Sequence, residues 1–299
     1  MTVLELASAS LRLRLVPAIG ASLLSLELRH RGAWVRVTRP APEPLARSSD
    51  SACFLLVPYS NRIRDGRFSF EGKTYQLVHA EKHAIHGDVR DRAWRIVSHD
   101  AASVRLAFDS REHADVNFPF PFTAEVTYRL DGAVFVSTLR VTNSGSERMP
   151  AGLGFHPYFE RALGGARELV ELKLAVGGVY PGDTPLPTGP PVPLAAAQDF
   201  SRARPLDVAL DHCFAGWDGH ARLRWPVTGV LAELQASPAL RHVIVYSPAG
   251  QPFFALEPVS NANDGFNLYA AGQRDTGVVA LAKDELLEGS FTLRFEDAD

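Results

Sequence analysis

The chain has 299 residues, of which 46% are hydrophobic, and its 31 basic and 34 acidic side chains leave a formal net charge of -3. Without a long run of either sign, this balance excludes a basic stripe for neutralising nucleic-acid phosphates and a polybasic membrane-binding surface. No apolar run approaches the roughly 18 residues of a membrane span, and the amino terminus lacks the pattern of a secretory signal. We therefore expect a cytoplasmic protein that binds a small, neutral or weakly charged molecule.

Short segments with a two-residue hydrophobic period recur along the whole chain, between scattered glycines and prolines. This period is typical of strands with one buried face. In chain order the predicted strands are Ser10–Val16, Ser22–Leu28, Cys53–Val57, Trp94–Ser98, Ser103–Phe108, Ala124–Leu130, Ala133–Val141, Val170–Leu174, Ala221–Trp225, Val230–Glu233, His242–Tyr246, Phe253–Leu256, Gly277–Ala282 and Ser290–Phe295. Asp131-Gly132 predicts a tight two-residue hairpin turn.

So many short strands, with almost no helical pattern, predict an all-β fold. A large twisted antiparallel β-sandwich, formed as one domain over residues 1–299, is the natural way to bury them. The stretch from Tyr180 to Pro193 is rich in proline and glycine, and we interpret it as a surface excursion. Cys53 and Cys213 lie in apolar segments, so we expect two buried thiols and no disulfide.

Polar side chains concentrate where an apolar run ends, at Asn61 and Arg62 after Cys53–Val57. Residues of these types at the end of a buried strand can bind a ligand, although they also cap turns and face solvent. The nucleophile elbow and the glycine-rich phosphate-binding and dinucleotide-binding loops are absent from the sequence. Acyl-transfer and nucleotide chemistry therefore have no support.

Three histidines, His79, His83 and His86, lie close together in the next polar segment. Their spacing lacks the His-Glu-x-x-His pattern of zinc hydrolases, and no amphipathic helix aligns them. We expect no metal and no other cofactor. His86 is the member of greatest interest, because Gly87 after it allows a ligand or another backbone segment to approach closely.

Two further segments carry ionisable groups inside apolar sequence. His156 lies between aromatic residues, and Glu257 ends the apolar run that begins at Phe253. A buried carboxylate costs several kcal/mol unless it is paired or functional. Asp211 is a second acid in an apolar stretch, where an aspartate is also common as a turn residue.

Taken in order, these segments resemble the aldose 1-epimerase family over nearly the whole chain. The match rests on Pro58-Tyr59-Ser60-Asn61-Arg62, His86-Gly87, Phe155-His156-Pro157-Tyr158-Phe159, Leu210-Asp211 and Glu257 before an asparagine-rich loop. The resemblance implies a galactose mutarotase-like supersandwich that converts the α and β anomers of an aldose. It also implies roles: Glu257 as general base, His156 as general acid, His86 as the second histidine near the ring oxygen, and Arg62, Asp211 and Asn61 as ligands of the sugar.

The chemistry asks for the same set of groups. Opening a pyranose requires one group to take the proton of the C1 hydroxyl and another to protonate the ring oxygen, which a carboxylate and an imidazolium can do. A nearby carboxylate is expected to help the histidine hold its proton. Tyr158, Trp217 and Phe266 are candidate stacking surfaces for the sugar.

Two alternatives remain open. Related hexose-6-phosphate epimerases have an arginine soon after His-Gly, and Arg90 stands at such a position in this chain. A carbohydrate-binding protein that has lost catalysis would have kept the same pocket. In each case the partner is a small sugar, with no nucleic acid and no membrane, and the protein is expected to be a monomer or a homodimer.

Overall fold

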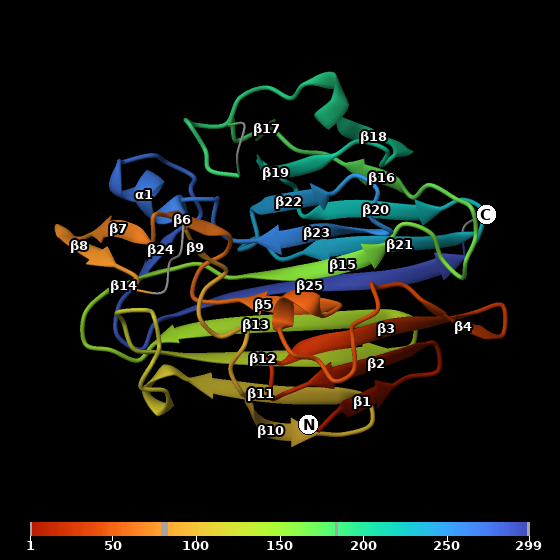
Figure 1. Cartoon of the computed structure of the whole chain (residues 1–299), viewed down its shortest axis with the longest axis horizontal. Coiled ribbons are helices and arrows are strands. Elements are labelled where there is room, and N and C mark those ends of the chain that lie inside the picture. Colours follow the sequence, from red (N-terminus) through yellow and green to blue (C-terminus); the bar gives the residue numbers. More distant parts are fainter. Residues whose placement is uncertain (1, 79–82, 183–184, 298–299) are drawn as a thin grey trace.

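The computed structural model describes residues 2–78, 83–182 and 185–297. Two large antiparallel sheets pack face to face, with their strands running in similar directions (Figure 1). The main hydrophobic core lies between them and takes residues from both sheets. This confirms the predicted all-β antiparallel sandwich.

The first of the two sheets has ten strands within the described residues. In spatial order it contains β1 (Leu4–Ala7), β2 (Leu11–Val16), β3 (Ser22–His30), β5 (Cys53–Leu56), β15 (Gly154–Glu160), β23 (Phe253–Val259), β22 (His242–Ser247), β19 (Leu210–Ala215) and β17 (Gly178–Val179), with β4 (Ala33–Arg36) paired to β3. Its central strands therefore come from distant parts of the chain.

The second sheet supports the first and has nine strands within the described residues. Its spatial order is β10 (Arg95–His99), β11 (Ser103–Asp109), β12 (Phe122–Asp131), β13 (Val134–Asn143), β25 (Leu286–Asp297), β21 (Val230–Ala236), β20 (His220–Trp225), β16 (Glu171–Leu174) and β18 (Phe200–Pro205).

Small elements gather at one end of the sandwich, at the left of Figure 1. They are the pairs β6 (Arg62–Arg64) with β9 (His83–Ile85), β7 (Arg67–Phe70) with β8 (Lys73–Gln76) and β14 (Met149–Ala151) with β24 (Val279–Leu281), and the helix α1 (Gly265–Ala270). Elsewhere lie three 3-10 turns: η1 (Ser48–Asp50), η2 (Ser110–Glu112) and η3 (Ala196–Gln198). The sequence analysis predicted no helix, and α1, with only six residues, is too short to show a clear helical period.

The two-residue period of β15 explains how this sheet can bury a core and carry a site at once. Phe155 and Phe159 point into the main core between the sheets. His156 and Tyr158 alternate with them and therefore face the other way, where Tyr158 joins a second apolar cluster on the outer face. Every residue of β15 from Gly154 to Phe159 is buried, because both faces of the strand are covered.

The predicted hairpin forms between β12 and β13, but its turn lies one residue later than expected. Asp131 pairs with Val134, so Gly132 and Ala133 are the two turn residues. Gly132 has a φ of 55° and takes the first central position, as in a type II′ turn. The two central residues of the turn are therefore Gly132 and Ala133, and not Asp131 and Gly132 as predicted.

Three other sequence predictions have structural outcomes. Cys53 and Cys213 are both buried free thiols, as expected. The excursion that starts at Tyr180 returns to the sheet at Val192, which forms a bridge with Val179. None of the helices in the described ranges is long and apolar enough to cross a membrane.

Candidate active site

Five neighbouring strands of the ten-stranded sheet bring the candidate residues onto its outer face. The strands are adjacent in the order β5, β15, β23, β22 and β19. Register pairs Phe54 with His156, Glu257 with Ile244, and Ile244 with Cys213. Side chains that share a face of paired strands lie side by side. Residues from Phe54 to Glu257, some of them about 100 positions apart in the chain, thus form one row across the sheet.

His156 and Glu257 form the centre of this row. His156 Nε2 lies 3.2 Å from Glu257 Oε1, and the exposed fractions of the two side chains are 7% and 2%. Phe54 stacks on the imidazole, with ring centroids 4.5 Å apart, and Tyr158 packs against it at 4.4 Å. His156 Nδ1 and Glu257 Oε2 are buried with no hydrogen-bond partner among the described residues. Two polar atoms are therefore left to interact with a ligand.

Burial governs the protonation of this pair. It raises the pKa of Glu257 well above the ordinary carboxyl value, and the charge of Asp211 raises it further. Burial also lowers the pKa of His156 to about 3, with the positive charge of Arg39 as the next contribution. The expectation that the carboxylate would help His156 to hold its proton is therefore wrong for this structure. Burial therefore favours the uncharged form of both groups, with the proton on Glu257.

His86, Asn61 and Arg62 form one corner of the site. The rings of His86 and His156 meet edge to face at 5.3 Å. The backbone N–H of Asn61 donates to His86 Nδ1 at 3.2 Å, and Arg62 Nη1 donates to Asn61 Oδ1 at 3.1 Å. Asn61 thus positions the ring of His86 and the guanidinium of Arg62. Because its amide oxygen is already engaged, this arrangement argues for a supporting role more than for direct contact with a sugar.

The backbone of this corner is unusual. Asn61 and His86 have positive φ angles of 51° and 64°, which are uncommon for residues other than glycine. Gly87 has a φ of 70°, and an added Cβ there would lie 1.8 Å from the carbonyl oxygen of Val57. The close approach predicted at Gly87 is therefore a backbone contact with the end of β5. This contact sets the direction of His86.

Asp211 lies on β19, two strands from Glu257, opposite Tyr246 of β22. Burial raises its pKa, while the charges of Arg62 and His212 lower it. Asp211 and Tyr246 also line a surface cavity of about 530 Å³. The structure thus places a second acid two strands from Glu257, where its charge acts on that carboxyl.

Two residues of this face were missed by the sequence analysis. Phe54 could have been found, since it occupies the alternate face of the predicted strand Cys53–Val57. Arg39 could not, because it lies between strands and belongs to no motif. Its guanidinium carbon is 3.5 Å above the ring centroid of Tyr158, beside His156.

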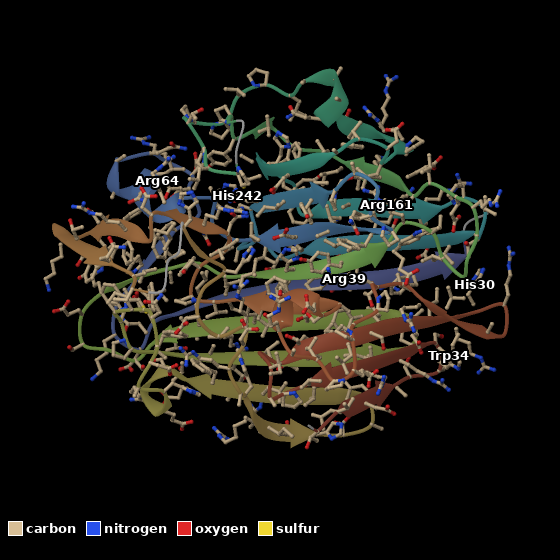
Figure 2. All side chains as sticks on the ribbon, in the orientation of Figure 1. His30, Trp34, Arg39, Arg64, Arg161 and His242 are labelled. Carbon is tan, nitrogen blue, oxygen red and sulfur yellow. The ribbon has the colours of Figure 1, made fainter. Side chains whose placement is uncertain are left out.

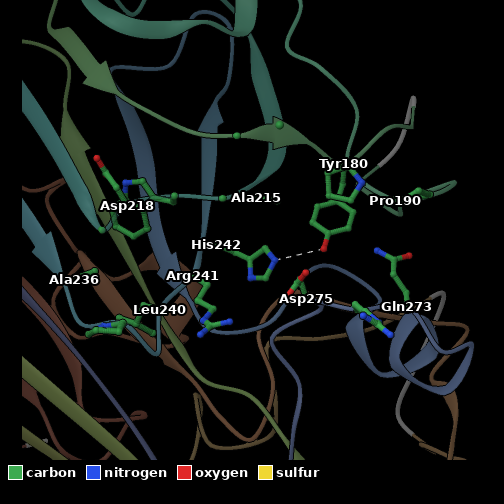
Figure 3. A pocket seen from close by; sticks show the side chains of 18 of the residues that line it. Tyr180, Pro190, Ala215, Asp218, Ala236, Leu240, Arg241, His242, Gln273 and Asp275 are labelled. Carbon is green, nitrogen blue, oxygen red and sulfur yellow. Dashed lines mark hydrogen bonds between the residues drawn. The ribbon is translucent and has the colours of Figure 1, made fainter.

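Two of the expected stacking residues lie outside this row. Phe266 is buried in the main core, where it packs against Tyr59 and Phe68. Trp217 lines a cavity of about 820 Å³, shown in Figure 3, which also contains Tyr180 and His242 but neither His156 nor Glu257. The proposal of Phe266 as a stacking surface is wrong, because α1 turns this side chain into the core. Tyr158 does lie in the site.

The histidine-rich segment is described only in part. His79 lies outside the described residues, so only His83 and His86 of the three histidines can be placed. The ring of His83 accepts a hydrogen bond from the backbone N–H of Asp65 at 3.0 Å. Within the ranges that the structure covers, no three histidine, cysteine or acidic side chains form a group able to hold a metal ion.

Comparisons with known proteins find related sequences and related folds. A family model for aldose 1-epimerase matches residues 3–294. YphB, an uncharacterized protein of Escherichia coli K12, is 31% identical over 288 residues, covering 89% of this chain and 91% of its own. Galactose mutarotase of Rattus norvegicus is 30% identical over 158 residues, covering 50% of this chain and 44% of that protein. A galactose mutarotase-like protein of Clostridium acetobutylicum, 20% identical, shares the fold with a TM-score of 0.85, covering 98% of this chain and 94% of its own.

Proposed function

The chain belongs to the aldose 1-epimerase family, and we propose that it interconverts the α and β anomers of an unphosphorylated hexose by acid–base ring opening. The observation that carries this proposal is the buried pair of His156 Nε2 and Glu257 Oε1, 3.2 Å apart. Ring opening needs one group to remove a proton and one to supply a proton within reach of the same sugar. The pair provides both in a site that excludes bulk water.

The steps use the unpartnered oxygen Oε2 of Glu257 and the ring nitrogen Nε2 of His156, which lies beside Glu257 Oε1. Glu257, as carboxylate, takes the proton of the C1 hydroxyl through Oε2, and the C1–O5 bond breaks. His156, protonated at Nε2, gives its proton to the ring oxygen O5, and the sugar becomes an open-chain aldehyde. Rotation about the C1–C2 bond presents the other face of the aldehyde. The O5 hydroxyl then attacks C1 while Glu257 returns a proton to O1 and His156 takes one from O5.

The neutral form of the pair has a place in this cycle. After ring opening, Glu257 holds the proton and His156 is neutral, which is the form that burial favours. Hydrogen bonds from sugar hydroxyls to the carboxylate stabilise its charged form, so a bound sugar shifts the proton toward His156 for the opening step. Each proton transfer contributes about 10² to 10⁴-fold in rate.

The direct test is the rate of anomer exchange. Saturation-transfer NMR between the two anomeric protons measures exchange for any aldose, without a coupled enzyme. We expect the purified protein to accelerate exchange of glucose or galactose in proportion to its concentration. A carbohydrate-binding protein without catalysis would bind the sugar and leave the exchange at its spontaneous rate, which would refute the proposed activity.

Arg62 and Asp211 are proposed to hold the hydroxyl groups of the ring. Replacing either one, as Arg62→Ala or Asp211→Asn, is expected to raise KM about tenfold or more and to change kcat less, since each removes a hydrogen bond to a charged group. Steady-state kinetics of anomer exchange at several sugar concentrations separates the two constants. A fall in kcat with KM unchanged would place these side chains in the proton transfer instead.

A hexose 6-phosphate is the competing substrate, and Arg90 is the reason to test it. The positive charge of Arg90 lowers the pKa of both His86 and His156. Its Nε lies 3.7 Å from Asp91 Oδ2. If glucose 6-phosphate outcompetes glucose by kcat/KM, and Arg90→Ala removes that preference, the phosphorylated sugar is the substrate. The unphosphorylated hexose is supported if Arg90→Ala leaves the preference for glucose unchanged.

A further inference from the structure

Arg39 is fixed against the strand that carries His156. Its backbone N–H donates to the carbonyl oxygen of Tyr158 at 3.0 Å, and Thr38 before it forms a bridge with Phe159. Its side chain donates from Nε and Nη2 to the carbonyl oxygens of Ser51 and Ser49. Figure 2 labels Arg39 near the middle of the molecule, away from Arg64 at the end with α1. The guanidinium is therefore held in one place on the site face.

This guanidinium is half-buried and has no carboxylate partner. It stacks over Tyr158 at 3.5 Å and lies 4.8 Å from the ring centroid of Phe253. The two nearest acids along the chain pair with other arginines: Glu43 with Arg14, and Asp50 with Arg47 at 3.2 Å. No ion pair to Arg39 is formed by any residue in the described ranges. Buried charges are normally paired, so an unpaired one that faces a binding site indicates a charged ligand group.

Two of the three guanidinium nitrogens, Nε and Nη2, donate to the two serine carbonyls, whereas Nη1 donates to no carbonyl or carboxylate oxygen among the described residues. Two donors on one nitrogen, carrying one positive charge, match the oxygens of a singly charged carboxylate. A phosphate has about two negative charges and normally recruits more arginine donors than this. Arg90 lies near Asp91, and the charge of Arg62 is balanced by Asp211. Arg39 differs from both because it forms no ion pair with a carboxylate in the described ranges, although the charge of Asp50 acts on it.

The position of Arg39 relative to His156 says which end of a sugar it meets. His156 packs on Tyr158 at 4.4 Å, and Arg39 lies on that same tyrosine. In the proposed reaction His156 serves the ring oxygen and Glu257 serves C1. Carbon C5 is bonded to the ring oxygen on the side opposite C1, and it carries C6. A group on C6 therefore points past His156, toward Tyr158 and Arg39.

We propose that Arg39 binds a carboxylate at C6, and that the preferred substrates are hexuronic acids such as glucuronate or galacturonate. This rests on the proposed epimerase function and specifies the class of hexose. Glucuronate is expected to exchange its anomers with a kcat/KM about 10- to 100-fold above that of glucose, the range that one hydrogen-bonded charge supplies. Glucose has the same ring and hydroxyl pattern without the charge.

The test compares glucuronate, glucose and glucose 6-phosphate on the whole protein and on Arg39→Met, by saturation-transfer NMR. Arg39→Met should remove the 10- to 100-fold preference for glucuronate over glucose, taken as the ratio of the two kcat/KM values, because any effect of the lost charge on His156 is common to both sugars. Arg39→Lys keeps the charge and should retain part of the preference. Arg12→Met is the matched control, because Arg12 also stacks on an aromatic ring, 3.9 Å from the centroid of Trp34 and outside the site.

Three outcomes would overturn the proposal. Equal losses for glucose and glucuronate in Arg39→Met would show that Arg39 only supports the local fold. Equal kcat/KM values for glucose and glucuronate in the unaltered protein would show that the site does not recognise a carboxylate. A preference for glucose 6-phosphate over glucuronate that depends on Arg39 would assign a phosphate.

Failure of the proposed function itself is distinguishable. If the protein accelerates exchange of no aldose, the epimerase activity is wrong, and binding then decides the role of Arg39. Titration calorimetry with glucuronate and glucose supports the carboxylate site if glucuronate binds more tightly and Arg39→Met abolishes the difference. Equal binding of both sugars contradicts it.

Discussion

Replacing Glu257 by glutamine is expected to lower kcat about 10²- to 10⁴-fold while changing KM less than about threefold. Glutamine keeps the shape of the side chain and its hydrogen bonding, but it cannot take a proton from the C1 hydroxyl. The loss should therefore appear in the transition state and hardly at all in binding. Anomer exchange measured as a function of sugar concentration gives both constants.

The matched control for this variant is Glu160→Gln. Glu160 is a half-buried carboxyl at the far end of β15, and burial raises its pKa as well, but it is not in the reacting pair. Its replacement should leave kcat within about twofold, as for a substitution remote from the chemistry. A folded Glu257→Gln protein with near-normal kcat would falsify the assignment of the base.

The stability of Glu257→Gln checks the burial of this carboxyl by a separate route. A group whose pKa is raised on folding, as for Glu257, contributes stability that is complete below the unfolded value of about 4.5 and is lost as pH rises through the folded value. Glutamine has no such loss. The variant should therefore be at least as stable as the parent at pH 7 to 8, with the difference shrinking as the pH approaches 4.5 in denaturant titrations.

Replacing His156 by glutamine is expected to have a comparable effect, about 10²- to 10⁴-fold on kcat. The amide nitrogen of glutamine reaches the position of Nε2, the atom 3.2 Å from Glu257 Oε1, so the contact can be kept while proton transfer to the ring oxygen is lost. KM should change little. Exchange kinetics again separate the two constants, and a KM increase with kcat unchanged would make His156 a binding residue only.

His242→Gln is the control for His156, because His242 is also buried and its pKa is also lowered by burial. It bonds the carbonyl oxygen of Ser260 and the hydroxyl of Tyr180, outside the reacting pair. Its loss should reduce stability and leave kcat within about threefold. If His242→Gln lowered kcat as much as His156→Gln, the loss in both variants would come from a disturbed fold and not from lost proton transfer.

The strands that carry the site were readable because each is a short, continuous apolar run. In Phe253–Leu256 and in Cys53–Val57, apolar side chains cover both faces, and the structure confirms a buried strand at each position. Glu257 stood out for the same reason, as a carboxyl at the end of an apolar run. The strand that leads to Glu257 could be predicted from the sequence. The distance between Glu257 and His156 could not, because it depends on how strands far apart in the chain pair.

Three features of the site could not be predicted from the local sequence pattern: the protonation of His156, the role of Arg39 and the position of Phe266. The protonation of His156 depends on burial and on Arg39, and neither is visible near His156 in the sequence. Arg39 itself stands between Thr38 and Pro40 in a segment without periodicity, and it acquires a role only through the backbone contact with Tyr158. Phe266 was misplaced because an aromatic residue in a loop and one in a short helix look alike in sequence.

The order of strands across the site has a consequence for how the protein folds. The row from Phe54 through His156 and Glu257 to Cys213 exists only when β5, β15, β23, β22 and β19 are all in place. Pairing of strands so far apart in the chain requires closure of long loops, which makes such topologies slow to form. No early intermediate built from local hairpins such as β12 and β13 can hold the reacting pair. The return of activity during refolding therefore marks completion of the whole ten-stranded sheet, later than the first gain of strand structure.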